Sequence, residues 1–100
     1  MTVLEVLKDD AIGRLTNEYM NLALDSAPYE KAGKSVPSLL YWRKGAMANM
    51  VYLLKCQPLE EFVPQLRNII NIHYIGDEAT KAAVNEYKKE LAIWESVIAS

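Results

Sequence analysis

The chain holds 100 residues, of which 51% are hydrophobic and 24% are charged, a composition close to that of average globular proteins. This length suits one hydrophobic core, so we expect a single domain over 1–100 and exclude two independent cores. Four glycines and four prolines supply too few turns for an all-β domain of this size, which favours an all-α fold.

The location of the protein is inferred from two further features. No run approaches the ~18 apolar residues of a membrane span, and the first residues lack the pattern of a secretory signal. We therefore expect a cytoplasmic protein that does not bind membranes.

The single cysteine, Cys56, has no partner for an internal disulfide and no zinc-site residues around it. The sequence thus predicts no metal and no cofactor.

The net charge of −2 is distributed unevenly along the chain. Residues 1–30 carry two basic and six acidic side chains, a net charge of −4. Residues 31–55 carry five basic side chains and no acidic one, and residues 56–100 return to a net charge of −3. A basic centre therefore lies between two acidic flanks.

The first expected helix covers 3–24. Thr2 and Glu5 have the spacing of a capping box, and the apolar residues that follow recur at steps of three and four, the period of one helix face. The densest cluster of helix breakers in the chain then predicts a loop over 25–38, with one helical turn possible at 28–31.

A second and a third helix follow the loop. Ser35 ahead of Pro37 resembles a helix entry, since proline in a first turn loses no intrahelical hydrogen bond, and this helix is expected to end near Lys55. Apolar residues resume at helical spacing after Pro58 and predict a third helix, for which Gly76 is placed as a left-handed stop.

The fourth helix, expected over 78–98, has the clearest pattern in the chain. Asp77 is placed to cap its N-terminus. Its apolar stripe consists of Ala79, Ala83, Tyr87, Leu91, Trp94 and Ile98. Four helices with short connections predict a compact antiparallel bundle, in which each stripe is buried against its neighbours.

Charged residues interrupt these apolar faces. Arg43 falls in the middle of the broad apolar side of the second helix, which carries Leu39, Leu40, Trp42, Ala46, Met47, Met50, Val51, Leu53 and Leu54. Glu90 lies within the stripe of the fourth helix and Glu86 near its edge, while His73 continues the line of the third. Because an unpaired buried charge is heavily penalised, we expect Arg43 to pair with Glu90 or Glu86, with His73 nearby. Such a set is either a structural network that sets helix register or a pocket for an anion or proton transfer.

The other side of the second helix combines two rings, two cations and two small residues: Tyr41, Lys44, Gly45, Ala48, Tyr52 and Lys55. Small residues let another backbone approach closely, and tyrosine and basic side chains suit contact surfaces. The candidate partner-binding residues on this face are Tyr41, Lys44, Ala48, Tyr52 and Lys55. A central helix that packs on both sides explains the same residues equally well.

The sequence contains no phosphate-binding glycine loop, nucleophile elbow or metalloprotease helix, so we expect a non-catalytic protein. The segregated charge and the surplus apolar residues Ile72, Ile75, Ile93 and Val97 favour an interaction module, one that docks onto a protein partner or onto copies of itself. Small acidic proteins of this kind often act as adaptors or inhibitors, some of them encoded by phages or other mobile elements.

The alternative is nucleic-acid binding by the basic 31–55 segment, whose lysines and tyrosines supply charge and stacking surface. The overall acidic balance opposes this interpretation. A helix-turn-helix made of the third and fourth helices would also present Asp77 and Glu78 to phosphate, with the wrong sign of charge.

Overall fold

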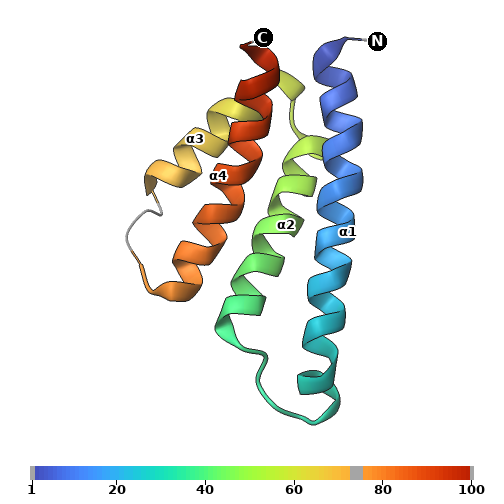
Figure 1. The fold of residues 1–100 in the computed structure, drawn as a ribbon, viewed down its shortest axis with the longest axis vertical. Coiled ribbons are helices and arrows are strands. Elements are labelled where there is room, and N and C mark those ends of the chain that lie inside the picture. Colours follow the sequence, from blue (N-terminus) through green and yellow to red (C-terminus); the bar gives the residue numbers. More distant parts are fainter. Residues whose placement is uncertain (1, 73–75, 100) are drawn as a thin grey trace.

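The computed structural model describes residues 2–72 and 76–99 of the chain. They form α1 (Val3–Lys31), α2 (Ser38–Cys56), the short 3₁₀ helix η1 (Leu59–Glu61), α3 (Phe62–Ile72) and α4 (Glu78–Ile98) (Figure 1). These two ranges contain no strand, and the predicted all-α class is confirmed.

The helices form a compact bundle in which α2 is central. It packs against α1 on one side and α4 on the other, and α3 packs against α4. Successive helices run in opposite directions, as the bundle prediction requires (Figure 1). The neighbours α2 and α4 therefore run in the same direction, and both ends of the described chain lie at one end of the bundle.

The first helix is longer than predicted. It begins as expected, because the hydroxyl of Thr2 accepts the backbone N–H of Glu5 at 3.2 Å and completes the capping box. It then runs to Lys31 rather than ending at residue 24, with Pro28 inside it. The predicted loop over 25–38 is therefore wrong in its first half.

Packing explains why α1 continues through the helix breakers. Leu22 and Ser26 are buried, and the Ser26 hydroxyl donates to the carbonyl of Leu22 at 2.8 Å. The helix therefore keeps its buried face for another turn. Pro28 removes one intrahelical hydrogen bond near the exposed end of the helix, where the loss is tolerated more easily than in the middle.

The entries to α2 and α3 differ in detail from the predictions. The helix expected to enter at Ser35 begins at Ser38, and Pro37 is its N-cap rather than part of its first turn. It ends one residue beyond the expected Lys55. The third helix begins at Phe62 after η1, so Pro64 occupies its first turn, where proline loses no intrahelical hydrogen bond.

The entry to α4 combines a predicted N-cap with a glycine that the packing requires. Asp77 caps the helix as predicted, since its carboxylate accepts the backbone N–H of Thr80 at 2.9 Å. The prediction of a left-handed stop at Gly76 concerns its junction with residues 73–75, which lie outside the described residues. The structure needs glycine at position 76 for space: a Cβ there would lie 2.7 Å from the Cβ of Thr80.

The core lies along α2 and is shared by all four helices. Its largest fully buried side chains are Trp94, Phe62, Met47, Met50, Leu54 and Leu66. The rings of Phe62 and Trp94 lie 4.8 Å apart and join α3 to α4. Four residues that the apolar stripes assign to the core are exposed instead: Tyr19 on the stripe of the first helix, Leu39, Trp42 and Ile98. Leu39 and Ile98 lie in terminal turns, beyond the packed part of their helices, and Trp42 faces a hollow described below.

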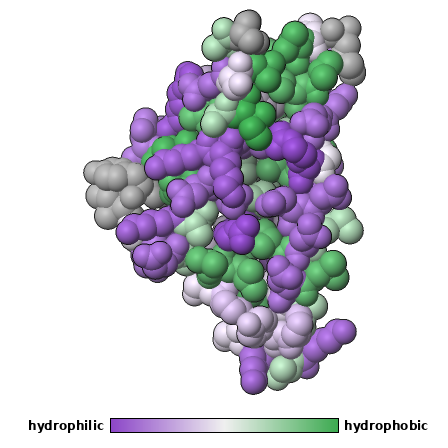
Figure 2. All heavy atoms as spheres, viewed as in Figure 1, coloured by the Kyte–Doolittle hydropathy of each residue, from purple (hydrophilic) through white to green (hydrophobic). Residues whose placement is uncertain are grey.

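The surface carries part of the surplus apolar area that the sequence predicts. Ile72 and Ile93 are exposed and Val97 is partly buried, while Ile75 lies outside the described residues. Figure 2 shows one face of the molecule, with hydrophilic residues across its middle and apolar residues gathered above and below. In the described part of the chain, no helix combines the length and the apolar character needed to cross a membrane.

Candidate functional site

A hollow of about 520 Å³ opens to solvent between α2 and α4. Its α2 side is formed by Tyr41, Trp42, Lys44, Gly45, Ala48 and Asn49. Its α4 side is formed by Thr80, Ala83, Val84 and Tyr87. We call this hollow the α2–α4 groove, and it also touches one residue of α1, Tyr19, and one of α3, Ile69.

The period of the helix produces the floor and the walls of the groove. Tyr41, Gly45 and Ala48 recur at steps of four and three, so they lie on one face of α2. A Cβ placed on Gly45 would have no atom within 4 Å, and Ala48 is exposed although its side chain is only a methyl group. The two small residues form a low floor. The rings of Tyr41 and Trp42 rise beside it, in edge contact with centroids 6.4 Å apart.

The wall formed by α4 is mostly apolar, and its main polar pair is satisfied internally. The Asn49 amide donates to the Tyr87 hydroxyl at 3.0 Å, across the groove from α2 to α4. Burial raises the pKa of Tyr87, and the hydrogen bond from Asn49 offsets part of that rise. Tyr87 is therefore a neutral wall residue at physiological pH.

The structure brings together three of the five partner-binding residues that the sequence suggests. Tyr41, Lys44 and Ala48 line the groove. Tyr52 and Lys55 are exposed one and two turns further along the same face of α2, outside the groove. The two interpretations of this face are compatible, because α2 packs on both α1 and α4 while Tyr41 and Tyr52 remain 62% and 56% exposed.

Sequence reasoning missed Trp42 and Tyr19, which it assigned to the core. Both line the groove, and Trp42 is exposed. A signal for Trp42 exists in the helical period: it lies at the edge of the apolar side of α2, next in sequence to Tyr41. The sequence does not predict the α4 wall of the groove, because it does not indicate that α4 lies beside α2.

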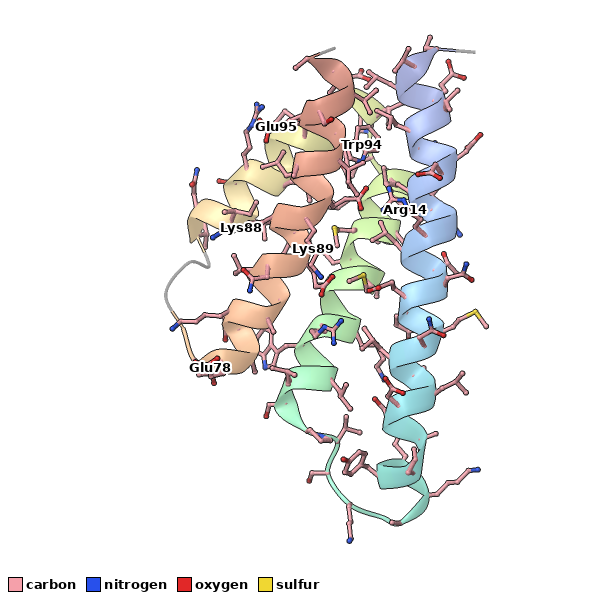
Figure 3. All side chains as sticks on the ribbon, in the orientation of Figure 1. Arg14, Glu78, Lys88, Lys89, Trp94 and Glu95 are labelled. Carbon is pink, nitrogen blue, oxygen red and sulfur yellow. The ribbon has the colours of Figure 1, made fainter. Side chains whose placement is uncertain are left out.

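A separate cluster of charged groups joins α1, α2 and α4. Glu90 is only 2% exposed, and its carboxylate accepts two hydrogen bonds from the Arg14 guanidinium at 2.9 and 3.1 Å. The indole N–H of Trp94 donates to the same carboxylate at 2.7 Å. Figure 3 shows Arg14 reaching from α1 toward α4. The hydrogen bonds that Arg14 donates to Glu90, and the one that it donates to Asp10, raise the pKa of Arg14 above its ordinary value although burial opposes the rise.

The other buried glutamate accounts for Arg43. Glu86 accepts from Arg43 Nε at 3.2 Å and from Lys89 Nζ at 3.5 Å, so one of the two pairings predicted for Arg43 is present. Glu90 takes Arg14 instead, a partner that the sequence does not indicate because Arg14 has a local acidic partner, Asp10, at 2.9 Å. His73, the third expected member, lies outside the described residues.

The pairing within this cluster favours a structural role. Each buried carboxylate accepts from an arginine, and within the described ranges no buried side-chain nitrogen or oxygen lacks a hydrogen-bond partner. An anion site would need a cation not already bound to a carboxylate. Searched over the same residues, His, Cys, Asp and Glu side chains form no group of three that could hold a metal ion.

Comparisons of the chain with protein-family models, with curated proteins and with solved structures find no match. The side chains of the two sites therefore have to indicate the function, since function belongs to a site rather than to a fold class. Both sites border a hollow, but the one beside the charge cluster is smaller, about 310 Å³, and the buried carboxylates in its lining already accept hydrogen bonds from arginines. The α2–α4 groove is therefore the stronger candidate for a binding site.

Proposed function

We propose that the protein is a non-catalytic interaction module that binds a protein partner, or a second copy of itself, through the α2–α4 groove. One observation carries the proposal: Tyr41 and Trp42 stand exposed beside a floor of Gly45 and Ala48 in an open hollow. Tyrosine and tryptophan supply much of the binding energy at protein interfaces, and small residues allow close approach of a partner backbone.

The non-catalytic part of the proposal is supported by the way the buried charges are used. Glu86 and Glu90 are the buried ionisable candidates for acid–base work, and both are bound to arginines. A catalytic acid or base exchanges a proton with a substrate, whereas the carboxylates of Glu86 and Glu90 already accept hydrogen bonds from arginine side chains of the protein itself. We further propose that the protein acts as an adaptor or inhibitor in the cytoplasm, a reducing compartment suited to the exposed thiol of Cys56.

The test fills the groove without disturbing the core. Ala48→Arg places a long charged side chain on the exposed floor, and Ala92→Arg places the same side chain on an exposed part of α4 outside the groove. We expect wild type and Ala92→Arg to retain a protein partner in affinity capture, or to self-associate by light scattering, and Ala48→Arg to lose that interaction. Equal behaviour of the two variants would refute the proposal.

A second candidate function is binding of single-stranded nucleic acid. Tyr41 and Tyr52 are exposed on the α2 face that also carries Lys44 and Lys55, and rings beside cations provide stacking and phosphate contacts. This function predicts that a labelled oligonucleotide binds with an affinity that falls steeply with salt. Replacing Lys44 and Lys55 by alanine would then weaken binding far more than replacing Lys88, which lies on the opposite helix outside the groove.

A further inference from the structure

We propose that the occupant of the α2–α4 groove is an acidic amphipathic helix of a partner protein. This inference rests on the function proposed above and names the chemistry of its ligand. Three properties of the groove carry it: its length, the apolar character of its lining, and a set of lysines that have no acidic partner within the described chain.

The length of the groove suits a short helix. On α2 the lining extends from Tyr41 to Asn49, and on α4 from Thr80 to Tyr87. At 1.5 Å per residue each wall is roughly 10 to 12 Å long, which is about two helical turns. The two walls lie side by side and run in the same direction (Figure 1). A channel between two adjacent helices is the geometry in which an amphipathic helix docks its apolar face.

The lining requires apolar contacts from its ligand. Trp42, Ala83 and Val84 provide apolar surface, and the floor of Gly45 and Ala48 leaves room for large anchoring side chains. The polar pair in the walls, Asn49 and Tyr87, is already hydrogen-bonded at 3.0 Å. The lining therefore offers a ligand few polar groups for hydrogen bonding. Anchors such as leucine or phenylalanine at helical spacing meet this surface best.

Charge determines which amphipathic helix fits. Lys44 is the one charged residue among the described side chains of the lining. It belongs to the 31–55 segment, which holds five basic residues and no acidic one. Arg43 forms an ion pair with Glu86. The four lysines of this segment have no carboxylate within 4.0 Å in the described parts of the chain: Lys31, Lys34, Lys44 and Lys55. Asp77, at the end of α4 near Thr80, is engaged by the backbone N–H and hydroxyl of that residue at 2.9 and 3.0 Å.

Lys44 in the lining of this apolar channel, with Lys55 further along the same face of α2, complements an acidic partner and repels a basic one. Single-stranded nucleic acid also binds cations, but it needs several of them along its path, and the described lining together with the α2 face beyond it offers two, Lys44 and Lys55. Acidic side chains on a helix would reach Lys44 at the groove and Lys55 beyond it, while the apolar face of the same helix fills the channel.

The experiment selects ligands of the groove from a library of helices. A displayed library of helices of about 16 residues, roughly four turns, has leucine at the anchor positions and an equal mixture of Glu, Lys and Gln elsewhere. The library is selected on the wild-type protein, and binders that also bind Ala48→Arg are discarded. We expect the selected helices to be enriched in Glu over Lys. Their affinity, measured by fluorescence anisotropy, should fall with added salt.

Charge reversal then locates the contact. Lys44→Glu should weaken the selected helices by roughly tenfold or more, as expected for a charge at the edge of an apolar contact. Lys88→Glu makes the same change outside the groove, because Lys88 lies on the side of α4 near α3, where Figure 3 labels it. This control should alter the affinity less than about twofold.

Several outcomes would overturn the inference: no selected helix, helices enriched in Lys, or binding insensitive to Lys44→Glu. An oligonucleotide of thymidines that binds the groove more tightly than any selected helix would also overturn it. Failure of the wider function is recognised separately. If the library fails but Ala48→Arg abolishes capture of a protein or self-association, the interaction module stands and only the acidic helix is wrong. If neither result is obtained, both are wrong.

Discussion

Replacing Arg14 by methionine should destabilise the fold far more than its partly exposed position suggests. The side chain of Arg14 is 37% exposed, but that of Glu90, which it binds through two hydrogen bonds, is only 3% exposed. Without Arg14, the buried carboxylate keeps the Trp94 indole N–H as its remaining protein partner. Leaving a charge buried without its counter-ion is among the most costly single changes in a protein.

The size of the effect follows from comparison of the two ion pairs of Arg14. The pair with Asp10 is an exposed i,i+4 contact, for which about 0.3 to 0.5 kcal/mol is typical. Breaking a fully buried pair costs about 3 to 5 kcal/mol, and because Arg14 is partly exposed to water we reduce this to about 2 to 3 kcal/mol. At this chain length each kcal/mol shifts Tm by about 4 to 8 °C, so Tm should fall by roughly 10 to 20 °C.

Urea unfolding followed by far-ultraviolet circular dichroism measures the free energy of unfolding of Arg14→Met. Asp10→Asn is the matched control, since it removes the exposed partner of the same arginine. Adding Glu90→Gln to Arg14→Met should restore part of the lost stability, because a neutral amide is cheaper to bury than an unpaired carboxylate. If Arg14→Met is no more destabilising than Asp10→Asn, the buried pair does not hold α1 against α4 and the reasoning is refuted.

Four further substitutions have expected outcomes. Gly13→Ala should raise the free energy of unfolding by about 0.5 to 1 kcal/mol, because a Cβ there meets no atom within 4 Å. Gly76→Ala should lower it by about 1 to 3 kcal/mol, because the added Cβ clashes with Thr80. Thermal melts of the two variants should therefore shift in opposite directions. Asp77→Ala should lower Tm at pH 7. Hydrogen bonds from Thr80 lower the pKa of Asp77 in the fold, so the carboxylate contributes stability above about pH 4, and this stability is lost as the pH falls through the lowered pKa. The melting curves of variant and wild type should therefore converge in acid. Burial raises the pKa of Tyr87, so stability should decline as the pH rises above about 10, and Tyr87→Phe should show a smaller decline in urea unfolding across that range.

The local parts of the structure were accessible from the sequence because they depend on neighbours along the chain. The capping box of Thr2 and Glu5 and the span of α4 behind Asp77 follow from hydrogen bonds within one turn. The shared face of Tyr41, Lys44 and Ala48 follows from the helical period alone. The pairing of Arg43 with a glutamate of α4 was expected because a buried cation requires an anion.

Other features were settled only when the helices packed. α1 passes through Pro28 because buried Leu22 and Ser26 keep it against the core, a contribution that helix propensity does not contain. The choice of Arg14 for Glu90 depends on α1 and α4 lying within reach of each other across α2.

The sequence by itself determined that this chain is helical, roughly where most of its helices lie, and which side of each helix is apolar, because those properties arise from hydrogen bonds and periodicity within about four residues. Only the tertiary structure decided that α2 lies beside α4, and with it the existence of the groove. Several arrangements of four amphipathic helices bury similar apolar area, and the choice among them depends on the fit of side chains that are distant in sequence.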